Sequence, residues 1–191
     1  MALCHRAAIV FEKKISYNNE NGLITIEWRI NLHIVLIEPE IPGNTGNIAR
    51  LCAATGFTLH LVKPLGFSVD DKYLKRAGLD YWHLVSIEYH DNFQAVLDKY
   101  PNNNFYFFSS KAPQSHCDVS YTEDDFLVFG KETAGIPESI LSEHWDNCVR
   151  IPMREEARCL NLSNAVAVAS YEALRQLDFY SLKKVGQEAI G

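Results

Sequence analysis

Three short runs of apolar residues constrain the fold of this chain more than any other feature. They cover residues 32–37, 105–109 and 126–129, and they are almost continuously apolar instead of alternating with polar residues. Such runs are typical of strands that are buried on both faces of a parallel sheet. Parallel neighbours need long crossover connections, which are usually helices. The runs therefore predict an α/β domain with a mostly parallel sheet and helices on both faces.

The segments between these runs continue the alternation of strand and helix. Gly56 and Gly78 stand where a helix is expected to end, because glycine readily adopts the left-handed conformation of a helix C-terminus. Residues 23–30 alternate like an edge strand. Further strands are expected at residues 58–62, 81–88 and 148–151. Helices are expected at residues 44–55, 70–77, 92–100, 137–143 and 161–177.

The length of 191 residues suits one domain with a proper core, and the chain has no internal repeat. We place this single domain at residues 31–180. Residues 1–30 form an N-terminal extension, which we expect to be poorly ordered or to start upstream of the start used in the cell. Residues 181–191 form a C-terminal tail.

Charge and composition exclude several classes of protein. The net charge of −6 argues against a protein that coats nucleic acid through bulk charge, although a local basic patch stays open. The five cysteines form no CxxC pair, which predicts free thiols in a reducing cytoplasm and no metal site. No run of eighteen apolar residues or secretory signal occurs, so we expect a cytoplasmic protein without a membrane span.

Ligands of open α/β sheets bind beyond the carboxyl ends of the strands, where this chain has polar loops at residues 109–111, 130–135 and 153–159. No loop carries a GxGxxG, GxxxxGK[ST] or GxSxG pattern, which disfavours dinucleotide, P-loop and hydrolase sites. The helix that begins near Asn161 carries Ser163 and a second asparagine in its first turn. These residues indicate either a well-capped structural helix or a polar docking site at a helix N-terminus.

Three blocks of sequence together resemble the motifs of the SPOUT methyltransferases. The blocks are NTGNIAR at residues 44–50, LVFGKETAGIP at 127–137, and the stretch from 151 to 173 that contains CLNLSNAVAVASYEA. The resemblance covers residues 32–179. It implies a deep C-terminal trefoil knot, an exception to the general rule against threaded chains. It also implies S-adenosylmethionine bound within the knot loops and a homodimer with active sites at the subunit interface.

The linking segments resemble one branch of this family most closely. That resemblance implies 2′-O-methylation of the ribose of the wobble pyrimidine, of the cytidine or carboxymethylaminomethyluridine type, in the tRNA anticodon loop. Three alternatives remain. The enzyme could methylate another tRNA or rRNA position, the chain could be a catalytically silent knotted RNA-binding protein, or it could be a nucleotide-binding enzyme of unrelated chemistry.

On the family pattern, six residues are expected to line the cofactor: Phe108, Gly130, Gly135, Ile151, Cys159 and Leu160. The two glycines suit a pocket lined by main chain, because the missing Cβ allows close approach, but ordinary turn chemistry would also explain them. Cys159 departs from the serine that the family pattern predicts. If that position contributes mainly its backbone, the change is tolerable.

The resemblance assigns catalytic roles to five residues. Arg50 falls on the position of a proposed base, although a guanidinium more easily binds a phosphate or stabilises a developing alkoxide. Asn44 and Glu132 are expected to fix loop geometry and orient Arg50. Asn161 marks the helix start, and Tyr171 meets the substrate across the dimer or belongs to the core.

RNA binding must be local, because the chain as a whole is acidic. The expected phosphate contacts are Arg50, Lys72, Lys75, Arg76 and Arg158. A solvated charged helix face is the alternative for the three residues on the expected helix 70–77. Two aromatic residues, Tyr81 and Trp82, are expected either to stack on an anticodon base or to belong to the core.

Overall fold

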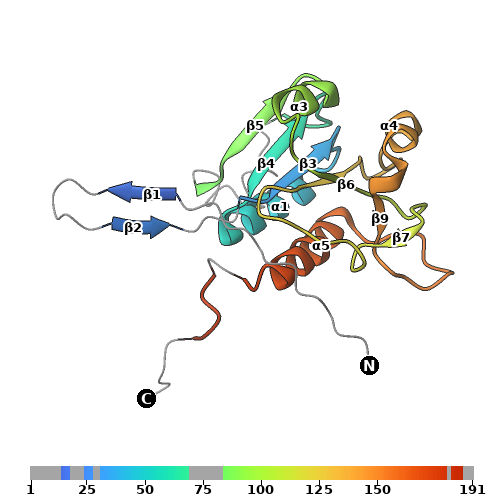
Figure 1. Ribbon diagram of the computed structural model, residues 1–191. Coiled ribbons are helices and arrows are strands. Elements are labelled where there is room, and N and C mark those ends of the chain that lie inside the picture. Colours follow the sequence, from blue (N-terminus) through green and yellow to red (C-terminus); the bar gives the residue numbers. More distant parts are fainter. Residues whose placement is uncertain (1–13, 18–23, 28–30, 69–83, 180–181, 187–191) are drawn as a thin grey trace, which may run out of the picture.

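A computed structural model of the protein shows a seven-stranded sheet in which every pairing is parallel. It describes residues 14–17, 24–27, 31–68, 84–179 and 182–186. The strands lie in the order β5-β4-β3-β8-β6-β9-β7 (Figure 1). Their bounds are His33–Ile37 (β3), Thr58–Val62 (β4), Ile87–His90 (β5), Phe105–Phe108 (β6), Gln114–Ser115 (β7), Phe126–Phe129 (β8) and Cys148–Arg150 (β9).

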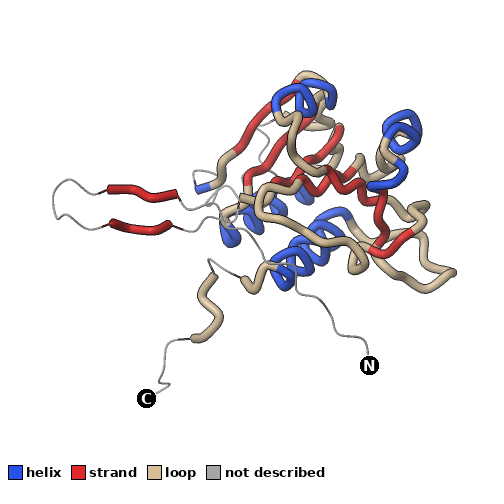
Figure 2. The backbone as a smooth tube through the Cα atoms, in the orientation of Figure 1, coloured by secondary structure: helices blue, strands red, loops and turns tan. Residues whose placement is uncertain are grey.

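Helices cover both faces of this sheet, as the apolar runs predict. Helices α1 and α5 pack on one face, and α3 and α4 lie on the other (Figures 1 and 2). Among the described residues, no helix is long and apolar enough to cross a membrane. The helix bounds are Pro42–Thr55 (α1), Phe93–Lys99 (α3), Glu138–Glu143 (α4) and Leu162–Gln176 (α5), with a 3₁₀ turn, η2, at Trp145–Asn147.

The core has two halves, one on each face of the sheet, because successive side chains of a strand point to opposite faces. Each half consists of strand side chains and the apolar stripe of the covering helices. On the α1/α5 face, fully buried residues include Ile34, Leu36, Ile48, Leu59, Leu61, Leu127, Ala169 and Leu174. On the α3/α4 face, the buried residues include Val35, Val62, Phe93, Val96, Phe107, Phe126 and Val128.

Most predicted elements are confirmed, with shifts at their ends. Gly56 closes α1 with φ 79° and donates its N–H to the Cys52 carbonyl. Helix α1 begins at Pro42, before the predicted start at Asn44, because proline fits the first turn of a helix. The predicted strand 81–88 is wrong at residues 84–86, since β5 begins only at Ile87.

Three further segments complete the comparison. Strand β7 was not predicted from the sequence, and the predicted helix 70–77 lies outside the described residues. Strands β1 (Lys14–Tyr17) and β2 (Ile24–Glu27) pair antiparallel in a separate two-stranded sheet. Strand β2 confirms the strand expected within residues 23–30.

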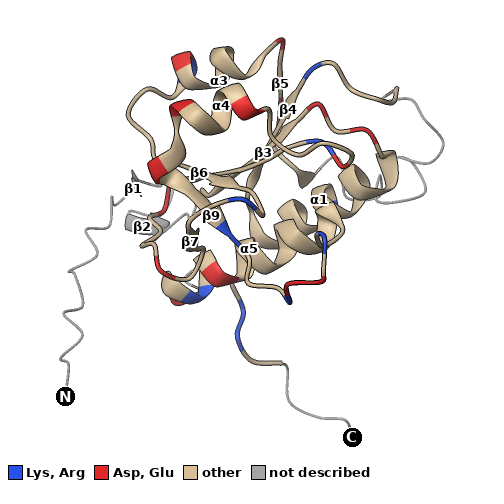
Figure 3. Cartoon of the chain, turned by 90° about the vertical axis from the view of Figure 1, so that its right-hand side faces the viewer, with Lys and Arg blue, Asp and Glu red and all other residues tan. Residues whose placement is uncertain are grey.

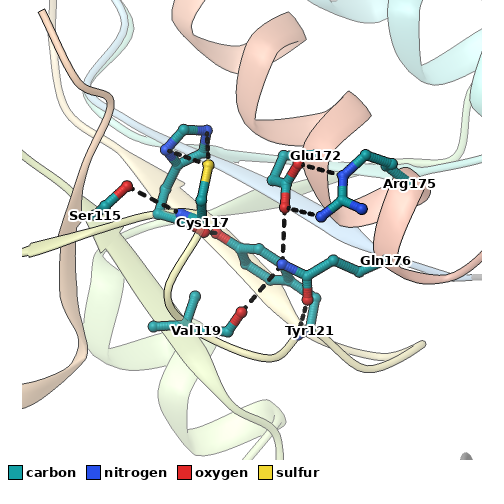
Figure 4. Close-up of polar contacts among 8 residues, drawn as sticks. Ser115, Cys117, Val119, Tyr121, Glu172, Arg175 and Gln176 are labelled. Atoms are coloured by element: carbon teal, nitrogen blue, oxygen red, sulfur yellow. Dashed lines mark hydrogen bonds and ion pairs between the residues drawn. The ribbon is translucent and has the colours of Figure 1, made fainter. Parts of the chain in front are cut away.

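The C-terminal half of α5 is fastened to the loop that follows β7 (Figure 4). The Gln176 side chain donates to the Val119 carbonyl (3.1 Å) and accepts from the Tyr121 N–H (3.1 Å). Glu172 accepts both from Gln176 (2.9 Å) and from the guanidinium of Arg175 (2.8 Å). These contacts hold α5 against the sheet, so that its N-terminus has a fixed position at the strand ends.

Candidate active site

A pocket of about 750 Å³ lies at the carboxyl ends of β6, β8 and β9. This is the edge at which open α/β sheets bind their ligands. The pocket is lined by segments 108–111, 129–138 and 158–162, together with Ile41, Asn44, Leu141, Ile151, Met153 and Ala165. The three polar loops singled out in the sequence therefore converge on one cavity.

All six residues expected at the cofactor line this pocket: Phe108, Gly130, Gly135, Ile151, Cys159 and Leu160. The turn between the two glycines is tight, because Gly135 donates its N–H to the Lys131 carbonyl (2.8 Å) with φ 71°. A Cβ on Gly130 would lie 1.9 Å from the carbonyl carbon of Gly135. Close backbone packing therefore requires glycine at 130, and the positive φ favours it at 135.

Glu132 joins the loop after β8 to the start of α1. Its carboxylate accepts from the N–H groups of Glu40 (2.8 Å) and Ile41 (3.2 Å) and from the Asn44 amide (2.9 Å). The first N–H groups of a helix have no partner within it, and Ile41 offers no polar side chain as a cap. Glu132 thus caps α1 from a distant loop and fixes the orientation of Asn44.

Asn161 extends this network to the start of α5. Its amide donates to Asn44 Oδ1 (3.0 Å), and its own Oδ1 accepts from the N–H (3.0 Å) and hydroxyl (2.7 Å) of Ser163. The capping role considered for Asn161 is therefore confirmed, and its position in the pocket wall keeps the ligand-docking role open. Glu132, Asn44 and Asn161 form one hydrogen-bonded chain that joins the loop after β8 to the starts of α1 and α5.

A second set of contacts reinforces the same junction. Lys131 forms an ion pair with Glu38 (2.9 Å), and the Thr133 hydroxyl donates to Glu40 (2.7 Å). The hydrogen bond from Lys131 to Glu38 raises the pKa of the lysine. Because β3 and β8 are adjacent parallel strands, the loops that leave them lie side by side. This arrangement gives the pocket wall a rigid base.

Other predicted site residues lie elsewhere. Arg50 is exposed on α1 and does not line the pocket. Tyr171 is 50% exposed on α5, also outside the pocket, with its ring centroid 6.4 Å from that of Phe179. Arg158 lies in the pocket wall. Lys72, Lys75 and Arg76, as well as Tyr81 and Trp82, lie outside the described residues.

Several residues of the pocket wall had no individual role predicted from the sequence, although Lys111 and Met153 lie in the loops singled out there. Ile41, Ile136 and Met153 contribute apolar surface, and Lys111 and Glu138 form an ion pair at its rim. The only signal for them is proximity to the polar strand ends, because a single apolar residue in a loop carries no periodicity.

The model of the SpoU rRNA Methylase family matches residues 31–171. The chain belongs to this family. A relative from Escherichia coli K12, named tRNA (cytidine(34)-2′-O)-methyltransferase, is 49% identical over 78% of this chain and 95% of its own. A Bacillus subtilis relative, assigned provisionally to the same activity, is 52% identical over 81% of this chain and 98% of its own.

A solved structure agrees with the sequence relatives. It is described as giving structural insights into the 2-OH methylation of C/U34 on tRNA. It is 46% identical, covers 78% of this chain and 97% of its own, and superimposes with a TM-score of 0.74. The SPOUT resemblance found in the three sequence blocks is therefore confirmed at the level of family and fold.

Proposed function

We propose that this protein transfers a methyl group from S-adenosylmethionine to the ribose 2′-hydroxyl of the wobble pyrimidine, nucleotide 34, in the tRNA anticodon loop. The observation that carries the proposal is near-complete coverage of relatives named for this reaction, at about half identity. The accepted bases are cytidine and uridine of the carboxymethylaminomethyl type. A cytoplasmic location, where tRNA is modified, follows from this function.

The pocket fits the cofactor in size and character. Its volume of about 750 Å³ falls within the range of roughly 300–1,000 Å³ for small-molecule sites. Ile151 and Leu160 supply apolar surface for an adenine ring, and the backbone around Gly130 supplies peptide groups. When bound there, S-adenosylmethionine supplies a methyl group activated by its sulfonium.

The residues have to align the ribose and manage charge. In the reaction the 2′-oxygen forms a bond to the methyl carbon, the carbon–sulfur bond breaks with its electron pair on sulfur, and the hydroxyl proton is lost. Asn44 and Asn161 hold the pocket wall at a fixed geometry through their mutual hydrogen bond. Arg50 stabilises the developing negative charge or holds the adjacent phosphate, because a guanidinium stays charged at neutral pH.

The placement of Arg50 and Tyr171 supports a homodimer. Both lie outside the pocket of their own chain, and in the proposed dimer they serve the reaction at the pocket of the second copy. Apolar side chains are exposed just before α1, just before α5 and on α5: Ile41 (48%), Leu160 (39%) and Val168 (43%). A second copy that covers this surface would complete the site. The C-terminal trefoil knot belongs to the same proposal.

RNA contacts in this proposal are local. Arg158 stands at the pocket and contacts no acidic side chain among the described residues, so its charge is available to a phosphate. Figure 3 shows basic positions near β9 and α5, with acidic positions beside them, and further acidic positions around α3 and α4. Lys72, Lys75 and Arg76 remain proposed contacts. The anticodon loop would therefore approach the β9–α5 side.

Methyl transfer from labelled S-adenosylmethionine to tRNA that lacks native modifications tests the function. After digestion, we expect label on the 2′-oxygen of the pyrimidine at position 34. Label at another nucleotide would reject the substrate assignment and leave the chemistry. Bound cofactor without transfer to any RNA would support the catalytically silent alternative.

Subunit mixing tests the dimer separately. Arg50→Ala removes the residue proposed to act at the partner's pocket, and Asn161→Ala damages the pocket of its own chain. A mixed dimer of these two inactive variants has one pocket with both defects and one with neither. We expect partial recovery of activity on mixing. No recovery, with mixed dimers shown to form, would contradict a shared site.

A further inference from the structure

A cluster of three histidines and a glutamate lies on β3, β4 and β5, toward the β5 edge of the sheet, whereas the pocket lies at β6, β8 and β9. His60 on β4 pairs in register with Glu88 on β5, and His90 follows two residues later on the same face of β5. His33 on β3 lies on this face as well, next to His60. The alternation of side chains along parallel strands thus places four titratable groups together beneath α3.

The distances among three of these groups match those around a tetrahedral metal ion. His60 Nδ1 lies 3.0 Å from His90 Nε2 and 3.4 Å from Glu88 Oε2, and His90 Nε2 lies 3.5 Å from the same oxygen. Ligands at about 2.0–2.2 Å from a tetrahedral zinc ion are roughly 3.3–3.6 Å apart, so the two distances to Glu88 fit as they stand and the two ring nitrogens would have to separate slightly. One atom from each residue therefore forms a face of a coordination tetrahedron.

Surrounding residues provide the outer contacts that metal ligands require. His60 Nε2 lies 2.8 Å from His33 Nδ1, and His33 Nε2 lies 3.1 Å from the Asn31 amide. When the ring proton of His60 sits on Nε2, that nitrogen can donate it to His33 Nδ1, and the lone pair of His60 Nδ1 is then available to a cation. The Tyr100 hydroxyl donates to the second oxygen of Glu88 (3.0 Å), which orients the carboxylate. Such outer partners fix the tautomer and direction of metal ligands.

The ligand atoms of this cluster are of the kinds that zinc binds. His60 and His90 each offer a ring nitrogen, and Glu88 offers a carboxylate oxygen, all within 3.5 Å of one another. The cluster thus combines two imidazoles with one carboxylate, a donor set that zinc accepts.

We propose that His60, Glu88 and His90 bind one divalent transition-metal ion, zinc above all, and that water completes the tetrahedron. Glu88 also lines a hollow of about 710 Å³ at the amino ends of β3 and β4, which gives an ion a path from solvent. The ion would join the edge strand β5 to β4. Its role is structural, because the cluster stands apart from the pocket at the carboxyl ends of β6, β8 and β9.

Substitution of Lys99 is expected to strengthen metal binding, the opposite of substituting a ligand. Its ammonium group lies 2.9 Å from the oxygen of Glu88 that would bind the metal, and its side chain is 54% exposed. Lys99 therefore competes with the ion for Glu88, and it can swing into solvent when the ion binds. Replacing Lys99 by glutamine should tighten metal binding.

The test uses the full-length protein, freed of metal with a chelator, and titrates Zn²⁺ against a chromophoric indicator. We expect one equivalent per chain, a higher thermal midpoint with Zn²⁺, and the intense visible absorption of four-coordinate cobalt with Co²⁺. Glu88→Gln and His90→Asn should weaken Zn²⁺ binding by more than about 100-fold. Loss of a residue that only supports a ligand weakens binding by up to about 100-fold, so a larger effect marks a direct ligand. Lys99→Gln should strengthen it.

His144→Asn is the matched control, since it removes a half-buried histidine that stacks on Phe107, far from the cluster. Its Zn²⁺ affinity should equal that of the unaltered protein. Circular dichroism verifies that each variant is folded, and Glu88→Gln keeps the shape of a side chain that is only partly buried. The absence of a stoichiometric site would overturn the proposal. So would full binding by both Glu88→Gln and His90→Asn, which would place the ion elsewhere.

Discussion

The carboxylate of Glu132 is expected to hold the start of α1, and Glu132→Gln tests this directly. The unaltered side chain accepts three hydrogen bonds, from the Glu40 and Ile41 N–H groups and from Asn44. Glutamine keeps the shape but has only one oxygen. Its NH₂ group would face an N–H donor, so at least one backbone donor near the helix start loses its partner.

The expected loss of stability follows from the nature of these bonds. A hydrogen bond to a charged group contributes about 1.5–3 kcal/mol, and an unpaired buried donor costs about 1–3 kcal/mol. The contact to Ile41 is exposed, so water can replace it and the low end of the range applies. We expect Glu132→Gln to lower the free energy of unfolding by about 2 kcal/mol. For a chain of this length, that corresponds to a fall of about 4–8 °C in Tm.

Urea unfolding followed by circular dichroism measures this change, at equal protein concentrations because a dimer gains stability by mass action. Glu138→Gln is the matched control: it removes an exposed carboxylate that pairs with Lys111 at the same pocket. Exposed ion pairs contribute little, so the control should unfold with the unaltered protein. A Glu132→Gln variant as stable as the control would refute the capping role of this carboxylate.

Three other results are expected. Gly130→Ala should abolish cofactor binding, because its Cβ would meet the backbone of Gly135, whereas Gly135→Ala faces open space and should cost only about 1–2 kcal/mol in unfolding experiments. S-adenosylmethionine should protect Cys159, which lines the pocket, from alkylation in mass spectrometry but leave the exposed Cys117 reactive; equal protection of both would contradict the site. Arg50→Ala should lower kcat by about 10²–10³-fold with unchanged cofactor affinity, and intact turnover would reject its catalytic role.

Local signals in the sequence predicted most of the sheet and helices. The apolar runs at β3, β6 and β8 and the glycine that ends α1 have local causes, namely burial on both faces and the left-handed conformation. The short strand β7 has no such signal, since its two residues are held by pairing with β9. The ends of some elements also depend on pairing between distant strands, so the start of β5 was predicted at the wrong residue.

The residues of the candidate site also divide into those that local signals predicted and those that depend on contacts between distant parts of the chain. The polar strand ends and the SPOUT resemblance together predicted most of the loops that form the pocket wall, including the six residues expected at the cofactor. The hydrogen bonds that join Glu132 to Asn44 and Asn161 span 88 and 117 residues along the chain, and no spacing rule predicts them. The His60–Glu88–His90 cluster escaped prediction for the same reason, because strand register brings its members together rather than a short motif.

The most direct test of the proposed function uses tRNA with a single 2′-deoxynucleotide. Substitution at position 34 removes only the hydroxyl that is proposed to accept the methyl group, and the same substitution at position 35 serves as the control. We expect transfer from labelled S-adenosylmethionine to cease with the first tRNA and to continue with the second. Continued transfer to tRNA that lacks the 2′-hydroxyl of nucleotide 34 would contradict the proposed reaction.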